Sequence, residues 1–221
     1  MKVGSKVVFL LRDLEGFGEA ISAAFRPNPS NSTVEKSFEL SLERYGIQNC
    51  KASGILRHFL DHQGLYEVSV LLMEYSEPPI LACAINEVLG ELAGRNSSSV
   101  PRVIQTEGGN KYSLYGIEIG SETSISKAMA TETQKPPPSL QIHHEPLACL
   151  LQLVRVLKLP TYVLIGQRGQ RISDKEEFQI LYEIGELLAS TLNLSFSRDK
   201  ITWNSTRESK DDREPWRALY G

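Results

Sequence analysis

The residues EPLACLLQLVRVLKLPTYVLIG, from Glu145 to Gly166, combine a long apolar helix pattern with a short strand pattern. After Pro146, apolar residues on nearly every side of Leu147 to Leu157 predict a central, buried helix. Pro160 ends that helix, and the run Thr161 to Ile165 predicts a buried strand. A buried helix that leads directly into a buried strand is typical of an α/β protein.

The same alternation of strands and helices extends toward the N-terminus. A strand at Lys6 to Leu11 precedes an amphipathic helix at Asp13 to Phe25. A buried strand at Tyr66 to Tyr75 precedes a helix from Ile80 to Leu92, which two prolines open. The remaining predicted elements are a short helix at Val34 to Tyr45, strands at Arg102 to Gln105 and Leu114 to Ile119, and helices at Ser124 to Thr133 and Asp174 to Leu192.

These elements predict one α/β domain over residues 1–202, a three-layer sandwich with a mostly parallel central sheet flanked by helices. Arg26 to Thr33 is predicted as a loop, and Gln48 to Gln63 is too mixed to assign. Residues 203–221 form a separate tail, because Asn204 to Glu214 is charged and contains no aliphatic residue. Such a segment buries too little surface to offset its ordering entropy, so we expect a flexible tail.

Charge and composition exclude several classes of protein. The net charge of -3 and the pI near 5.9 disfavour binding to nucleic acid, which needs a concentrated basic face. No run approaches the ~20 apolar residues of a membrane span, and Val7 to Leu11 is too short for a signal peptide. The widely spaced Cys50, Cys83 and Cys149 are typical of thiols kept reduced. We therefore expect a protein of the cytoplasm, the nucleus or both.

One loop is placed where α/β folds often hold anions. The turn Gly166 to Gly169 follows a predicted strand and precedes a helix that Ser173 caps. The turn matches neither a Walker loop nor a dinucleotide fingerprint. A plain surface turn is therefore the competing interpretation.

Histidines offer little support for a metal site. His58 and His62 would share a helical face, and His143 and His144 precede a predicted helix. A zinc site needs further ligands at a recognisable spacing, and the sequence does not supply them. We expect neither a metal nor another cofactor.

Polar residues after the first strand also have two interpretations. Arg12, Asp13 and Glu15 lie at the end of a strand where α/β active sites occur, but helix capping and solvent exposure explain them equally well. No motif such as G-x-S-x-G surrounds a candidate nucleophile. The sequence therefore predicts no catalytic residues.

The last residues of the chain carry a more informative pattern. Leu219, Tyr220 and Gly221 offer an aliphatic group, a phenol and a terminal carboxylate, which together suit a pocket in another protein. With the tyrosine content and the hydrophobic fraction of this chain, chance produces a hydrophobic residue followed by tyrosine in about 1.5% of such endings. In the competing interpretation the tail folds back and packs on the domain, above all through Trp216.

This ending resembles the hydrophobic-Tyr-X motif by which proteasome assembly chaperones and activators dock on the core particle. The body agrees in outline over residues 66 to 193, above all in the helix and strand of Glu145 to Gly166. The resemblance implies a heterodimer of related α/β subunits that scaffolds assembly of the proteasome α-ring. Within it, the Gly221 carboxylate would pair with a pocket lysine while Tyr220 and Leu219 fill the pocket. The body resembles the first subunit of that pair, whereas Glu214 to Gly221 resembles the ending of the second, so either subunit remains open for this chain.

The leading hypothesis is therefore a non-enzymatic chaperone for assembly of the proteasome core particle, with Trp216, Leu219, Tyr220 and Gly221 binding a partner. One alternative is an α/β enzyme that binds an anionic small molecule at Gly166 to Gly169. Another is an interaction module unrelated to proteasomes, with apolar helix faces as its partner surface.

Overall fold

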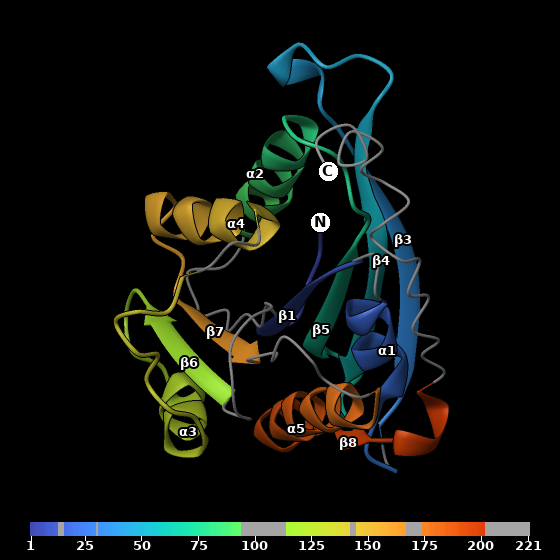
Figure 1. The fold of residues 1–221 in the computed structure, drawn as a ribbon. Coiled ribbons are helices and arrows are strands. Elements are labelled where there is room, and N and C mark those ends of the chain that lie inside the picture. Colours follow the sequence, from blue (N-terminus) through green and yellow to red (C-terminus); the bar gives the residue numbers. More distant parts are fainter. Residues whose placement is uncertain (13–15, 30, 94–113, 142–144, 167–173, 202–221) are drawn as a thin grey trace.

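The computed structural model describes residues 1–12, 16–29, 31–93, 114–141, 145–166 and 174–201, and it has an α/β fold (Figure 1). The elements in chain order are β1 (Lys6–Leu11), α1 (Phe17–Ala24), β2 (Phe25–Arg26), β3 (Thr33–Ser41), the 3₁₀ turn η1 (Glu43–Tyr45), β4 (Lys51–Leu60), β5 (Tyr66–Met73), α2 (Ile80–Ala93), β6 (Leu114–Ile119), α3 (Ser124–Glu132), α4 (Glu145–Val156), β7 (Thr161–Gly166), α5 (Asp174–Leu192), β8 (Ser195–Phe196) and the 3₁₀ turn η2 (Arg198–Lys200).

The main sheet has four strands in the order β1-β5-β4-β3. Only β1 and β5 run parallel, whereas β4 is antiparallel to both of its neighbours. Two smaller antiparallel sheets pair β2 with β8 and β6 with β7. The prediction of a mostly parallel sheet is therefore wrong, and a three-layer sandwich is not confirmed. Residues 61–65, which alone join β4 to β5, are too few for the crossover that parallel strands require.

Most predicted elements are confirmed, and one is wrong. The strands β1, β5, β6 and β7 and the helices α2 to α5 lie where the sequence places them, and α1 is shorter than expected. Val34 to Tyr45 is not a helix, because β3 occupies most of it and pairs with β4 from Thr33 to Ser41. In the predicted loop Arg26 to Thr33, the first residue belongs to β2 and the last to β3.

Helices pack on both faces of the main sheet and divide the core in two (Figure 1). Val7, Phe9 and Leu71 point to the face that α2 and α4 cover. Val8 and Val70 point to the opposite face, which α1 and α5 cover. Each fully buried aliphatic side chain contributes about 1.5–3 kcal/mol relative to an exposed one. The alternation along each strand therefore holds helices to both faces.

Several predictions fall outside the described residues. They include the strand at Arg102 to Gln105, the Ser173 cap and the tail. Among the helices of the described part, none is long and apolar enough to cross a membrane.

Candidate functional site

The predicted partner anchor cannot be placed on this fold. Trp216, Leu219, Tyr220 and Gly221 all lie outside the described residues, so the anchor stays a prediction. The description ends at Ile201, which packs against the core cluster between the main sheet and α1 and α5.

Arg12, at the carboxyl end of β1, ties two strands and a helix together. Its backbone N–H donates to the Met73 carbonyl at 2.8 Å. Its guanidinium lies 2.5 Å from a Glu74 carboxylate oxygen and 3.3 Å from one of Glu19. Two carboxylates thus already pair with the Arg12 guanidinium, which favours a structural role over anion binding. Asp13 and Glu15 lie outside the described residues.

His58 belongs to a buried polar cluster and not to a helical pair of metal ligands. It lies in β4, so the prediction that it shares a helical face with His62 is wrong. The ring stacks on Tyr66 with centroids 4.0 Å apart, and Nδ1 lies 2.8 Å from Ser69 Oγ. Burial, and then the nearby Lys36 ammonium, lower the pKa of His58. Within the described ranges, no group of three His, Cys, Asp or Glu side chains is arranged to hold a metal ion.

Gly166, the first residue of the candidate anion-binding turn, has a packing role. A Cβ at this position would lie 2.6 Å from Ile180 Cγ2 and 3.2 Å from Ile184 Cδ1. The glycine therefore lets β7 approach α5 closely. The rest of the turn, through Gly169, lies outside the described residues, as do His143 and His144.

The three cysteines are unpaired and half-buried. Burial raises the pKa of the Cys149 thiol, with smaller contributions from Glu145 and Cys83. A thiol with a raised pKa is a poor nucleophile at neutral pH. Cys149 therefore has the character of a packing residue.

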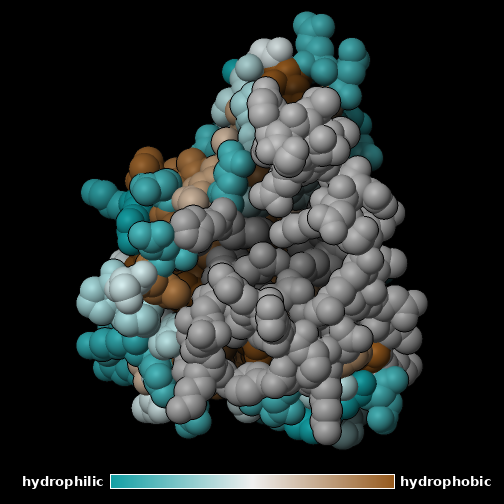
Figure 2. All heavy atoms as spheres, viewed as in Figure 1, coloured by the Kyte–Doolittle hydropathy of each residue, from teal (hydrophilic) through white to brown (hydrophobic). Residues whose placement is uncertain are grey.

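The described surface offers two places that a partner can contact. The first is β3, an edge strand whose outer side has no partner strand in the described ranges. The second is α4, where Val156 is 74% exposed. Figure 2 shows apolar side chains gathered at the upper left, where α4 lies in Figure 1. The sequence predicted α4 as a central helix, and this is correct for its inner side. It did not predict that the other side of the helix is exposed.

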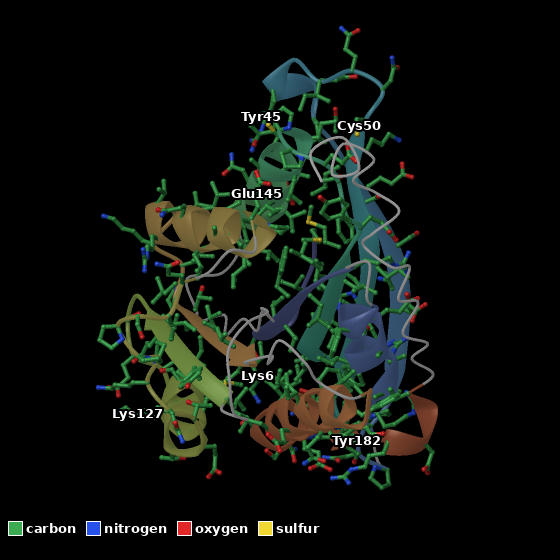
Figure 3. All side chains as sticks on the ribbon, viewed as in Figure 1. Lys6, Tyr45, Cys50, Lys127, Glu145 and Tyr182 are labelled. Carbon is green, nitrogen blue, oxygen red and sulfur yellow. The ribbon has the colours of Figure 1, made fainter. Side chains whose placement is uncertain are left out.

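Contacts at the middle and near the end of α2 fix its position beside these surfaces. At the middle, Asn86 Nδ2 donates to the Tyr45 hydroxyl at 2.8 Å, which ties η1 to the helix. Tyr45 stands above α2 in Figure 3, and Glu145 lies at one end of α4. The N-terminal amine of Met1 pairs with Glu91, near the last turn. These contacts hold α2, and with it α4, against the sheet.

Comparison with known sequences gives a match to one family model. The model of a family described as "Domain of unknown function (DUF7894)" matches residues 1–221. No curated protein matches the chain in a comparison of sequences.

Several solved structures share the fold at low sequence identity. PbaA of Pyrococcus furiosus, an archaeal homologue of proteasome-assembly chaperone, is 14% identical with a TM-score of 0.55, over 99% of this chain and 93% of that one. PbaB of the same organism, an archaeal proteasome activator, is 10% identical with a TM-score of 0.53, over 100% of this chain and 96% of PbaB. The Mycobacterium tuberculosis proteasome-assembly chaperone homologue Rv2125 is 9% identical with a TM-score of 0.52, over 97% and 93%. The resemblance to proteasome assembly chaperones is therefore confirmed at the level of the fold.

Proposed function

We propose that this chain, which belongs to the family described as a domain of unknown function (DUF7894), is a non-enzymatic chaperone for assembly of the proteasome core particle. The observation that supports the proposal is a fold shared, over nearly the whole chain, with proteins named for proteasome assembly or activation. The polar clusters of the described residues agree with it, because Arg12 and His58 each have structural partners.

The proposed partners are the α-ring subunits of the proteasome and a related chaperone subunit that forms a heterodimer with this chain. The tail is proposed to dock between neighbouring α subunits. There the Gly221 carboxylate pairs with a lysine, the Tyr220 phenol fills the pocket and Leu219 packs on its wall, with Trp216 close by. We propose that this takes place in the cytoplasm and the nucleus.

The free energies expected for tail binding require the folded body to take part as well. Burial of Leu219 and Tyr220 contributes about 3 to 5 kcal/mol, and the carboxylate contact about 1.5 to 3 kcal/mol. Ordering each residue of the tail costs about 1 to 2 kcal/mol. A tail alone therefore binds weakly, and a second contact through the folded body raises its effective concentration. Attachment of this kind is reversible, which suits a chaperone that leaves the mature complex.

Affinity purification of three matched chains tests the function and the tail mechanism separately. The chains are the intact protein, a chain that lacks Leu219 to Gly221, and a Tyr75→Ala control that alters an aromatic side chain 46% exposed elsewhere on the surface. Each carries an N-terminal tag, and proteasome α subunits are quantified by mass spectrometry. We expect the intact chain and the control to recover α subunits equally and the shortened chain to recover far fewer. Equal recovery by the shortened chain contradicts tail docking, and no recovery by the intact chain contradicts the function.

A further inference from the structure

The outer side of α4 forms a continuous exposed stripe. The inner side is buried in the core through Leu147, Leu150 and Val154, each no more than 1% exposed. Half-buried apolar residues border the stripe along one side. The exposed residues of the helix, which we call the α4 outer face, are Glu145, Ala148, Gln152, Arg155 and Val156. They recur at intervals of three and four residues, the spacing at which one helix packs along another.

Opposite charges stand at the two ends of this face. Glu145 lies in the first turn of α4 and Arg155 in the last. Neither side chain has an ion-pair partner in the part of the chain that the structure describes. An identical helix laid antiparallel on this one would bring each glutamate opposite an arginine. The face is therefore complementary to itself.

We propose that α4 is a self-association site, at which the outer faces of two copies of this chain pack antiparallel about a two-fold axis. Glu145 of each copy then lies opposite Arg155 of the other. Near the axis, the small Ala148 lies opposite the longer Gln152, which lets the helices approach. Val156 covers the first turn of the other helix and loses its exposure. This proposal does not rest on the proposed function.

Self-complementarity is the reason to choose a second copy over an unrelated partner. A two-fold dimer uses the same surface on both subunits, so one chain must supply both halves of every contact. The α4 outer face supplies both halves of each contact: Glu145 and Arg155 at its two ends, and Ala148 and Gln152 near its centre. A lone exposed valine is ordinary. Val156, however, lies next to Arg155, at the end of a face whose charges are complementary to those of a second copy.

The size of the face sets the expected affinity. The overlap from Glu145 to Arg155 is about 15 Å long at the helical rise per residue. An interface of that length buries less than the ~1,200 Å² of a standard stable complex. We therefore expect a weak dimer, with a dissociation constant on the order of 100 µM.

Charge reversal with mixing tests the arrangement directly. Sedimentation velocity of the intact chain in reducing buffer, up to about 500 µM, is expected to show a monomer–dimer equilibrium. Glu145→Arg and Arg155→Glu should each raise the dissociation constant about tenfold, since each places like charges at both ends of the dimer. An equimolar mixture of the two variants should recover the original affinity as a heterodimer, because every charge again faces its opposite.

Matched controls separate the interface from general surface effects. Val156→Glu should weaken the dimer at least tenfold, whereas Leu65→Glu, at an equally apolar site 60% exposed in the turn before β5, should not. Lys127→Glu, a charge reversal on α3, should also leave it unchanged. A monomer at every concentration, a dimer insensitive to the α4 variants, or a mixture that fails to restore affinity each overturns the proposal.

Discussion

The imidazole of His58 lies in the core of the main sheet, where its charge state affects folding. Ser69 Oγ accepts a hydrogen bond from the Gly4 N–H at 2.8 Å, so its own proton is available to His58 Nδ1 at the same distance. A neutral Nδ1 accepts that proton, but a protonated imidazole has no lone pair there. The depressed pKa of His58, caused first by burial and then by Lys36, agrees with a neutral ring.

Acid should therefore weaken the fold through this residue. The pKa of His58 is lower in the folded than in the unfolded state, so the unfolded chain binds the proton more readily. Stability is then retained above the unfolded pKa of about 6.5 and lost as pH falls through the folded pKa. Urea unfolding at about pH 7.5 and about pH 5.5 measures the loss, and His58→Gln should lose less than the natural chain. Equal losses in both would mean that His58 does not contribute.

Two helical glycines should respond in opposite ways to the same substitution. In α1, a Cβ at Gly18 would lie 2.1 Å from the Leu11 carbonyl oxygen, which the backbone holds in place. In α2, the nearest atom to a Cβ at Gly90 is Arg44 Nη2 at 3.8 Å, the end of a flexible side chain. Gly18→Ala should destabilise the fold by about 1–3 kcal/mol, and Gly90→Ala should stabilise it by about 0.5–1 kcal/mol. Denaturant midpoints decide the matter, and a stabilising Gly18→Ala would contradict the close approach of α1 to β1.

Among the elements, α3 has a complete capping box at its N-terminus. Thr123 Oγ1 accepts from the Ser126 N–H at 3.0 Å, and Ser126 Oγ accepts from the Thr123 N–H at 2.8 Å. Thr123→Ala should cost about 1 kcal/mol and speed amide exchange in α3 first. Thr131→Ala removes a hydroxyl that bonds only within the same helix, to the Ala128 carbonyl, and should cost less than about 0.5 kcal/mol. If both changes cost the same, the cap is not what sustains the helix.

The strands that sequence reasoning missed are those whose pattern depends on distant partners. In β3, Val34, Phe38 and Leu40 alternate as in a strand, but Lys36 interrupts them on the same face. Its ammonium donates to the Tyr66 hydroxyl at 2.9 Å, a contact thirty residues away in the chain. In β4, Gly54 breaks the pattern because a Cβ there would lie 2.3 Å from the Leu72 carbonyl oxygen. Local periodicity cannot register such partners, whereas α5 is confirmed at both ends because its pattern is uninterrupted.

At the scale of the whole molecule, one hairpin explains the error in the topology of the main sheet. The sequence showed a strand, a helix and a second strand, β1, α1 and β5, and these do pair in parallel. It did not show β3 and β4, which lie between α1 and β5 in the chain and add two antiparallel strands beside β5. Structural roles for Arg12 and Gly166 also became visible only with their spatial neighbours. The fold class and most elements were therefore predictable from sequence, and the sheet and its surfaces were not.

The division of the chain into residues 1–202 and 203–221 makes a prediction for the whole molecule. Asn204 to Glu214 contains no aliphatic residue, so this part of the chain has little apolar surface to bury in a core. A chain that ends at Thr202 should therefore unfold within about 2 °C of the full chain, while it loses the recovery of proteasome α subunits. Differential scanning calorimetry and the affinity purification above measure the two effects on the same preparation. A midpoint of thermal unfolding lowered by many degrees would mean that the tail packs on the domain through Trp216 and does not serve as a free anchor.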